Sequence, residues 1–396
     1  MVKSFKYRIY PTHKQTTDFC QILDGCRWLY NHLLEQRKTL WESEKKSISC
    51  FDQCNTFKQL KQEHLFLTEI HSQVLQNVAR RIDFAFKTFF RRIKSGDKPG
   101  YPRFRSKFRY DSFTYPQLGF KIFKNVVQLS KIGSVKINFH RPMEGIVKTC
   151  TIRRTPTGKW FISFSCNIDY KVIENPINPA IGIDMGLKKF ATLSNGEQID
   201  NPRFFRKEEK SLAKAQRKLS AQEKGSKKRI KARKVVARVH ERITNKRSNF
   251  AHQESRKLIN RFNTICVEDL SINDMKKDNF HSINKSIGDA AWRMFLECLR
   301  YKAVYAGSRC IQVNPAYTTQ NCSRCGNRQK LKLSDRTYHC PCCGLIINRD
   351  YNASLNILAL GMQSLSASVE QKPPPLGGGA FIEGPDKEII EHNVKL

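Results

Sequence analysis

The chain has 396 residues, with 71 Lys and Arg against 35 Asp and Glu, which gives a formal net charge of +36 at pH 7. An ordinary metabolic enzyme does not carry such an excess, because like charges repel one another and attract polyanions. The excess therefore favours a protein that binds nucleic acid. Charge alone does not separate a specific nucleic-acid-binding protein from a ribosome-associated protein or from a basic protein without a specific partner.

The hydropathy of the chain bears on where the protein resides. The N-terminus lacks the apolar stretch of a secretory signal, and no apolar run is long enough to span a bilayer. We therefore expect a cytoplasmic protein that makes no membrane contact. Because thiols stay reduced in the cytoplasm, the 14 cysteines indicate metal binding or buried packing, not disulfides.

The first part of the chain is predicted to hold a strand, a group of helices and then short strands. Residues 3–9 alternate and predict a strand, and two or three helices follow to about residue 95. The last of these helices carries apolar residues at spacings of three and four, which predicts a face packed in the core: Ile82, Phe86, Phe89, Phe90 and Ile93. Short strands are predicted from about 112 to 170, most clearly at 160–164.

Basic and aromatic residues alternate over residues 103–110, a combination suited to phosphate contacts and base stacking. The candidate nucleic-acid-binding residues of this segment are Arg103, Arg105, Lys107 and Arg109. A half-buried strand with a solvated basic face would give the same pattern. The prolines at 176 and 179 predict a linker, and we place the main domain boundary there.

The second part of the chain combines buried strands with a basic helical segment. Apolar strands are predicted at 180–184, near 190–193 and at 264–268, and an amphipathic helix at 292–303. Residues 203–247 hold 18 Lys or Arg and four Glu, and they predict a basic hairpin of two helices. A solvated helix face is the alternative, but the positive charges have too few acidic residues to form ion pairs with along such a face. Its candidate nucleic-acid-binding residues are Lys227, Lys228, Arg229 and Arg233.

Four cysteines form two C-x-x-C pairs: Cys322, Cys325, Cys340 and Cys343. Gly326 and Gly344 each follow the second cysteine of a pair, where glycine lets the backbone turn tightly around a metal. Four thiolates predict one closed, tetrahedral, structural Zn²⁺ site, with unligated thiols as the alternative. Cys342 is a possible substitute for Cys343, although the i, i+3 spacing favours Cys343, and we expect His339 to be a bystander.

Three acids stand where a strand ends or a helix begins. Asp184 and Glu268 each close a predicted buried strand, and Asp350 lies at the start of a predicted helix. Carboxylates are the ligands that Mg²⁺ prefers, and two such ions can clamp the attacking and leaving oxygens of a phosphodiester. Each acid could instead cap a turn or a helix, Asp350 above all as a helix N-cap. Residues 182–186 also resemble the first phosphate loop of actin-like ATPases.

Several short motifs, taken together, resemble the TnpB (OrfB-type) family of insertion-sequence proteins, which are related to type V CRISPR nucleases. They are G-I-D at 182–184, V-E-D-L at 267–270, R-D-Y-N-A at 349–353, and N-P-A-Y-T-T-Q at 314–320 leading into the cysteines. The opening Y-R-I-Y-P-T at 7–12 with Gln15, and the stretches 101–104 and 112–115, match as well. The resemblance runs in order over roughly residues 3–360. One departure is Asn348, at a position that the family often fills with Asp, where it would weaken the outer support of the metals.

The resemblance implies an α/β multidomain fold. Residues 1–178 would form a β-barrel-like wedge and a helical recognition region that bind nucleic acid. Residues 179–361 would form a RuvC-like nuclease with an RNase H fold, which includes the basic hairpin at 203–247 and an inserted zinc ribbon at 318–345. We expect residues 362–396, with their Pro and Gly clusters, to be a disordered tail.

The resemblance further implies an enzyme, a Mg²⁺-dependent DNA endonuclease with Asp184, Glu268 and Asp350 as catalytic residues. Two catalytic Mg²⁺ and one structural Zn²⁺ would be its cofactors. A guide RNA from the transposon end would direct it to double-stranded target DNA beside a short flanking motif. The alternatives are a catalytically silent RNA-guided DNA-binding protein and an actin-like ATPase, which would not need a charge of +36. A strand-transferring transposase is a further alternative, although no recombinase motif with Tyr or Ser is recognisable.

Overall fold

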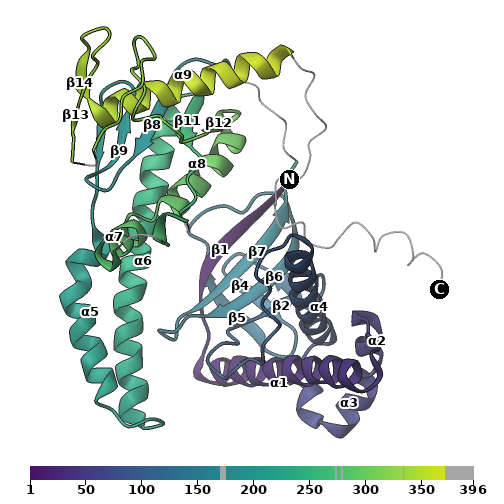
Figure 1. The fold of residues 1–396 in the computed structure, drawn as a ribbon. Coiled ribbons are helices and arrows are strands. Elements are labelled where there is room, and N and C mark those ends of the chain that lie inside the picture. Colours follow the sequence, from purple (N-terminus) through teal and green to yellow (C-terminus); the bar gives the residue numbers. More distant parts are fainter. Residues whose placement is uncertain (170–174, 273, 278–279, 333, 371–396) are drawn as a thin grey trace. The chain divides into compact units, whose positions relative to one another are not determined.

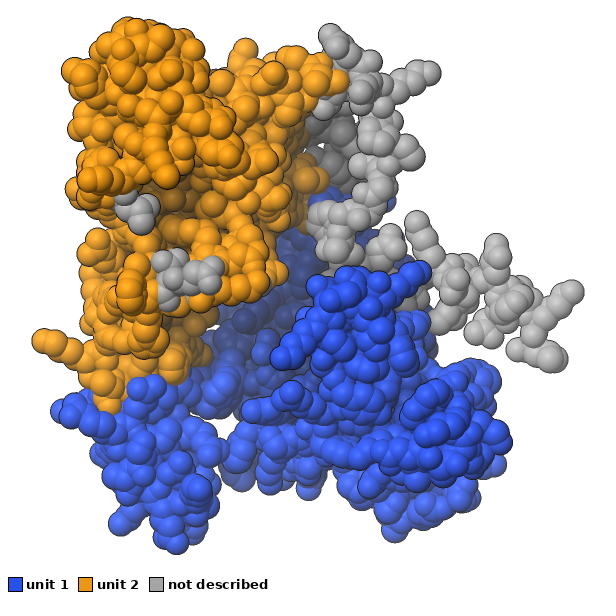
Figure 2. Space-filling view, viewed as in Figure 1, with its two compact units in different colours: residues 1–171, 214–238 blue, residues 172–213, 239–396 orange. Residues whose placement is uncertain are grey.

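The structure is a computed structural model that describes residues 1–169, 175–272, 274–277, 280–332 and 334–370. The chain divides into two compact units (Figure 2), residues 1–171 with 214–238 and residues 172–213 with 239–396. The outer part of the predicted hairpin thus groups with the N-terminal unit, whereas the sequence placed the whole hairpin in the nuclease region. No helix in the described ranges is long and apolar enough to cross a membrane.

Unit 1 is built on an antiparallel sheet of seven strands in the order β2-β6-β7-β1-β5-β4-β3. The strands are β1 (Val2–Tyr10), β2 (Ser112–Tyr115), β3 (Phe120–Ile122), β4 (Val126–Leu129), β5 (Gly133–Asn138), β6 (Ile146–Arg154) and β7 (Trp160–Asn167). The Tyr115 hydroxyl donates to the Ser130 carbonyl oxygen at 3.0 Å, which links β2 at one edge to the end of β4 near the other. The sheet is therefore nearly closed into a barrel. The predicted strands at 3–9 and 160–164 are confirmed.

The helices of unit 1 are α1 (His13–Glu44), α2 (Cys50–Asn55), α3 (Phe57–Glu63) and α4 (Ser72–Lys94), with a short 3₁₀ turn η1 (Leu65–Leu67). These are four helices, where two or three were predicted. Helix α1 begins in a capping box, in which Thr12 and Gln15 each accept a hydrogen bond from the other's backbone N–H. It covers the sheet by packing Phe19 against Trp160, with ring centroids 4.8 Å apart.

The apolar stripe of α4 does not lie wholly in the core. Ile82 is buried, but Phe90 is 59% exposed and Ile93 is 49% exposed. The prediction of core packing is therefore wrong for the C-terminal turns of α4. The periodicity correctly predicts one helical face, but it does not reveal where the sheet beneath that face ends.

Unit 2 contains a mixed sheet of five strands in the order β10-β9-β8-β11-β12. The strands are β8 (Ala180–Met185), β9 (Lys189–Leu193), β10 (Gln198–Asp200), β11 (Thr264–Glu268) and β12 (Arg309–Val313). Strands β8, β11 and β12 run parallel to one another, while β9 and β10 are antiparallel to their neighbours. The predicted strands at 180–184, 190–193 and 264–268 are confirmed.

Helices cover both faces of this sheet. The helices from residue 204 onward are α5 (Phe204–Ser220), α6 (Lys227–Arg261), α7 (His281–Ala290), α8 (Trp292–Ala306) and α9 (Arg349–Glu370), with a 3₁₀ turn η2 (Asp274–Lys276). Helices α6 and α8 pack on one face, where Phe190 meets Phe250 and Phe295 edge-on at centroid distances of 4.9 and 5.1 Å. Helix α9 crosses the other face over Cys266 and Val313 (Figure 1).

Helix α9 ends later than the sequence suggested. Residues 362–370 continue the helix, so the expected tail boundary at 362 is wrong for these residues. The Pro and Gly clusters that motivated the tail lie outside the described residues. The two strands β13 (Thr337–His339) and β14 (Ile346–Asn348) form a separate hairpin immediately before α9.

Candidate active site and cysteine site

The alternation of side chains along β8 and β11 places two of the three acids on one face of the sheet. Ile181, Ile183 and Met185 of β8 belong to the core beneath α6 and α8. Gly182 and Asp184 therefore point to the opposite face, which α9 covers. The same alternation on β11 turns Glu268 toward α9. Asp350 lies in the first turn of α9, so all three predicted acids meet on this face.

The electrostatics of the three carboxylates agree with their convergence. Burial raises the pKa of Asp184 well above its usual range, and the charges of Glu268 and Asp350 raise it further, while Arg349 opposes this rise. Burial also raises the pKa of Glu268. The Thr318 hydroxyl donates to Glu268 Oε1 at 2.6 Å, and this hydrogen bond lowers the pKa in part. A buried cluster of like charges is stabilised when cations bind it, so the arrangement is chemically suited to hard metal ions.

Asn348, not Asp350, caps helix α9. Its Oδ1 accepts the backbone N–H groups of Asp350 and Tyr351 at 3.0 and 3.1 Å. The interpretation of Asp350 as an N-cap is therefore wrong, and its carboxylate instead contacts two guanidinium groups. Arg349 Nη2 lies 3.1 Å from Oδ1, and Arg336 Nη1 lies 3.9 Å from Oδ2. Asn is as good an N-cap as Asp, so the departure at 348 preserves the start of the helix.

Glycine at position 182 allows α9 to approach the sheet. A Cβ there would lie 2.1 Å from the carbonyl oxygen of Ser354 and 2.7 Å from the backbone nitrogen of Leu358. Gly182 is therefore a packing position beneath α9. This role offers no support for the alternative in which residues 182–186 form a phosphate loop.

Sequence reasoning missed Thr318, which is buried and forms the hydrogen bond to Glu268 from 50 residues away. Asn356 of α9 fixes this threonine by donating Nδ2 to its carbonyl oxygen at 2.8 Å. Asn352 Nδ2 donates to the Asn321 carbonyl oxygen at 2.8 Å, so α9 also holds the segment that leads into the first cysteine pair. The sequence feature that could have singled out Thr318 is its place in the motif at 314–320.

The four predicted cysteines come together as a candidate metal site. Their sulfur atoms all lie within 4.8 Å of one another, with Cys322 and Cys343 3.6 Å apart and Cys325 and Cys340 3.5 Å apart. Sulfurs arranged tetrahedrally at about 2.3 Å from zinc are roughly 3.8 Å apart, so the donor set and spacing fit zinc. Cys342 is exposed and outside the set.

The glycines of the two knuckles adopt the expected conformation. Gly326 and Gly344 have φ values of +74° and +68°, which L side chains rarely adopt. Their N–H groups donate to the carbonyl oxygens of Cys322 and Cys340 at 2.9 and 3.0 Å and so close each knuckle. Backbone N–H groups, first that of Cys343, lower the pKa of Cys340 to about 6 and thereby favour the thiolate that binds metal.

The basic segment of unit 1 is an exposed loop, not a half-buried strand. Arg103, Arg105, Lys107 and Arg109 are all exposed, and so are the rings of Phe104 and Phe108. From the tip of the hairpin, the Arg233 guanidinium lies over the Phe108 ring at 4.5 Å from its centroid. These residues form one basic-aromatic surface within unit 1.

The hairpin residues differ in what they can contribute to that surface. Lys227, Lys228 and Arg233 are exposed. Arg229 instead closes the hairpin turn by donating to the carbonyl oxygens of Leu219 and Gln222 at 3.1 and 2.5 Å. The sequence pattern could not separate this structural arginine from its neighbours.

Comparison with known proteins assigns the chain to a family. Residues 163–279 match a family model described as "Probable transposase", and residues 292–357 match a "Cas12f1-like, TNB domain". A protein of Streptomyces pristinaespiralis named "Putative RNA-guided DNA endonuclease" is 35% identical over 91% of this chain and 89% of its own. The Escherichia coli K12 protein InsQ, which carries the same description, is 30% identical over 91% and 92%. The chain therefore belongs to the TnpB family, which is related to Cas12f1.

The fold agrees with this assignment. The chain resembles the protein in the cryo-EM structure of a Cas12f1–sgRNA–target DNA complex with a TM-score of 0.57 and 15% identity, covering 90% of this chain and 98% of that one. Residues 1–46 also match a model described as "Helix-turn-helix domain". In the structure these residues form strand β1, the single helix α1 and the residues that follow it, so they contain no pair of helices.

Proposed function

We propose that the protein is an RNA-guided DNA endonuclease that hydrolyses phosphodiesters at Asp184, Glu268 and Asp350. The observation that carries this proposal is the meeting of three carboxylates on one face of the sheet of unit 2, where burial and mutual repulsion raise the pKa of Asp184. The five-stranded mixed sheet with helices on both faces supports a RuvC-like nuclease with an RNase H fold. The descriptions of the two full-length relatives support the same activity.

The donor set suits Mg²⁺, because it offers carboxylate oxygens in a buried and negatively charged site. Two Mg²⁺ ions, when bound, would supply an activated water and stabilise charge on the leaving oxygen. Around them Thr318 orients Glu268 by its hydrogen bond, and Asn348 fixes the first turn of α9, which carries Asp350. We assign Zn²⁺ to the four cysteines as a structural ion, since a closed thiolate set leaves no position for substrate.

The basic-aromatic surface of unit 1 supports a role in holding nucleic acid. Guanidinium and ammonium groups contact phosphates, while exposed rings such as Phe104 and Phe108 can stack on bases. Contacts of this kind grip a strand without reading a long sequence. We therefore infer that a guide RNA from the transposon end selects double-stranded target DNA by base pairing.

The first experiment tests the acids. Asp184→Ala, Glu268→Ala and Asp350→Ala should each abolish Mg²⁺-dependent cleavage by the purified RNA–protein complex while leaving target binding intact. Gel-shift and cleavage assays on the same preparations separate the two effects. Cleavage at the wild-type rate by any variant removes that residue from the site. Binding without cleavage by the wild type itself would indicate a catalytically silent DNA-binding protein.

The second experiment tests guidance. The protein, expressed with its transposon end, should copurify with RNA that resists added nuclease. Replacing the guide segment should redirect cleavage to the newly complementary target. Sequence-specific cleavage by RNA-free protein would contradict guidance but leave the nuclease assignment in place.

A further inference from the structure

A basic cavity of about 580 Å³ lies in unit 2, and one of its lining residues, Arg336, contacts Asp350. Its wall comes from the β8–β9 turn, the residues that lead into α5, helix α7 and the hairpin before α9. The lining residues that matter here are Lys188, Asn201, Arg203, Arg206, Ser286 and Arg336. Its volume falls within the range of about 300–1,000 Å³ that ligand sites occupy.

One contact and one stretch of chain connect this cavity to the proposed catalytic acids. Arg336 lines the cavity and also lies 3.9 Å from Oδ2 of Asp350. Lys188 follows Asp184 closely in the turn after β8. Asn201 fixes that turn by donating Nδ2 to the Leu187 carbonyl oxygen at 2.9 Å. A single side chain, Arg336, therefore reaches from the cavity to Asp350.

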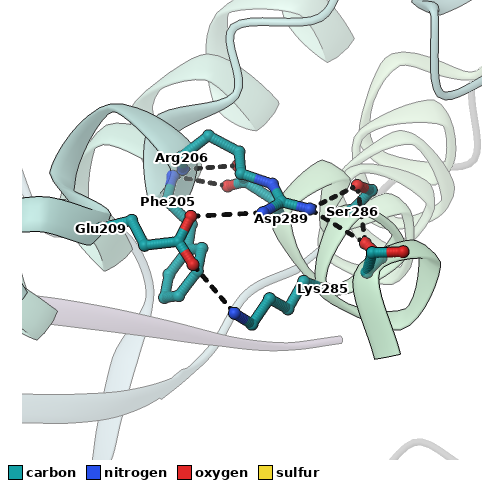
Figure 3. Close-up of polar contacts among 7 residues, drawn as sticks. Phe205, Arg206, Glu209, Lys285, Ser286 and Asp289 are labelled. Atoms are coloured by element: carbon teal, nitrogen blue, oxygen red, sulfur yellow. Dashed lines mark hydrogen bonds and ion pairs between the residues drawn. The ribbon is translucent and has the colours of Figure 1, made fainter. Parts of the chain in front are cut away.

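Among the described residues of the cavity wall, Asp289 is the one carboxylate, and it is already satisfied. It accepts the backbone N–H groups of Phe205 and Arg206 at 2.7 and 3.2 Å (Figure 3). The Arg247 guanidinium also donates to it at 2.8 Å. Asp289 thus caps the N-terminus of α5, so that the amides of Phe205 and Arg206 are not free to bind an anion. The cationic side chains of the wall are therefore the groups to consider for an anion.

The cationic side chains divide into one that is fixed and others that are available. Arg206 is held by Glu209 at 3.2 Å and by the Ser282 carbonyl oxygen at 3.0 Å (Figure 3). Lys188 and Arg203 are exposed, and within the described ranges neither has a carboxylate at ion-pair distance. Arg336 is shared with Asp350, so Lys188 and Arg203 are the described cations of the wall that no described carboxylate neutralises. This charge pattern fits a phosphodiester backbone.

We propose that this cavity binds the backbone phosphates of the DNA strand next to the bond being cut, with Arg203 and Lys188 as positioning residues. The proposal rests on the nuclease function proposed above. It adds a defined subsite outside the metal-binding acids, which aligns the strand so that the scissile phosphate reaches them. Misalignment of a reacting group by about 1 Å can cost on the order of 10²-fold in rate.

The test pairs protein variants with single neutral phosphates in the target. Arg203→Ala and Lys188→Ala complexes are compared with wild type in single-turnover cleavage of targets that carry one methylphosphonate at successive positions flanking the cut. Wild type should lose about tenfold or more at one or two positions, as expected for the loss of a charged hydrogen bond. On the fully charged target, Arg203→Ala or Lys188→Ala should lower the cleavage rate by a similar factor. A methylphosphonate at the sensitive position should then lower the rate of that variant little further. Lys210→Ala, which removes an exposed charge from α5 outside the cavity, is the matched control.

The outcomes separate this proposal from the nuclease assignment. Absence of cleavage by wild type on the fully charged target contradicts the nuclease function itself. If the cavity variants cut as fast as wild type, the cavity proposal alone is overturned. The same holds if the rate loss from the protein substitution and the loss from each methylphosphonate simply multiply, which shows no coupling. If coupling appears instead with methylphosphonates placed in the guide RNA, the cavity holds RNA and the assignment to the DNA strand is wrong.

Discussion

Gly182→Ala should impair cleavage without touching any charged group. The added Cβ would lie 2.1 Å from the Ser354 carbonyl oxygen and 2.7 Å from the Leu358 nitrogen, where ordinary contacts are about 3.5–4.0 Å. Both are backbone atoms of α9 and cannot rotate away, so the helix must shift by about 1 Å. Such overpacking costs about 1–3 kcal/mol of stability. The same shift moves Asp350 relative to Asp184, and a displacement of that size can cost on the order of 10²-fold in rate.

The assay combines thermal unfolding with single-turnover cleavage at saturating Mg²⁺. We expect a folded Gly182→Ala protein that unfolds at a lower temperature and cuts about a hundredfold more slowly, while target binding is retained. Gly100→Ala is the control, because Gly100 has open space around its Cβ position and no positive φ. Wild-type stability and cleavage rate in Gly182→Ala would refute the argument that close packing of α9 on β8 positions the acids.

Three further predictions concern the same region. Thr318→Val should slow cleavage about tenfold or more and raise the Mg²⁺ requirement, because buried Glu268 loses a hydroxyl donor at 2.6 Å, whereas Thr318→Ser should cut normally; equal rates for the two variants would contradict this. Cys322→Ser should lose zinc by elemental analysis, whereas Cys342→Ser, outside the cluster, should keep it; equal zinc content in both would contradict the four-cysteine site. The native state keeps a proton on Asp184 at pH values where the unfolded chain has lost it, so metal-free stability should fall as pH rises from the ordinary carboxyl range through the raised pKa. Asp184→Asn should remove this loss and unfold at a higher temperature at neutral pH without metal; a lower unfolding temperature would show that the carboxylate is stabilised in the native state.

The candidate site was predictable to the extent that its signals are local. Asp184 and Glu268 close short apolar runs that alternate in side-chain direction, and the cysteine pairs have the spacing of a metal knuckle. By contrast, Thr318 reaches Glu268 across 50 residues, and nothing in the surrounding pattern encodes that distance. Arg229 looks like any other basic residue of the hairpin until its carbonyl partners are seen.

The aromatic stripe of α4 illustrates the same limit. Its three- and four-residue spacing is typical of a buried helical face, and the helix indeed buries Ile82. Phe90 lies further along the same face but remains 59% exposed. Periodicity depends only on the geometry of one helix, whereas burial depends on whether another element lies opposite each turn.

The sequence by itself determined the basic character of the protein, the strands that carry Asp184 and Glu268, the two cysteine pairs and, through its motifs, the family. These features follow from composition, from period-two alternation and from short spacings, all of which are properties of the chain before it folds. The motifs grouped Asp350 with the other acids only by resemblance; the tertiary structure shows how they meet, because α9 lies against Gly182 of β8. The tertiary structure alone decided that Asn348 is the cap and that Arg336 reaches from a basic cavity to Asp350. Contacts of this kind depend on which surfaces pack together, and no local pattern of residues specifies that.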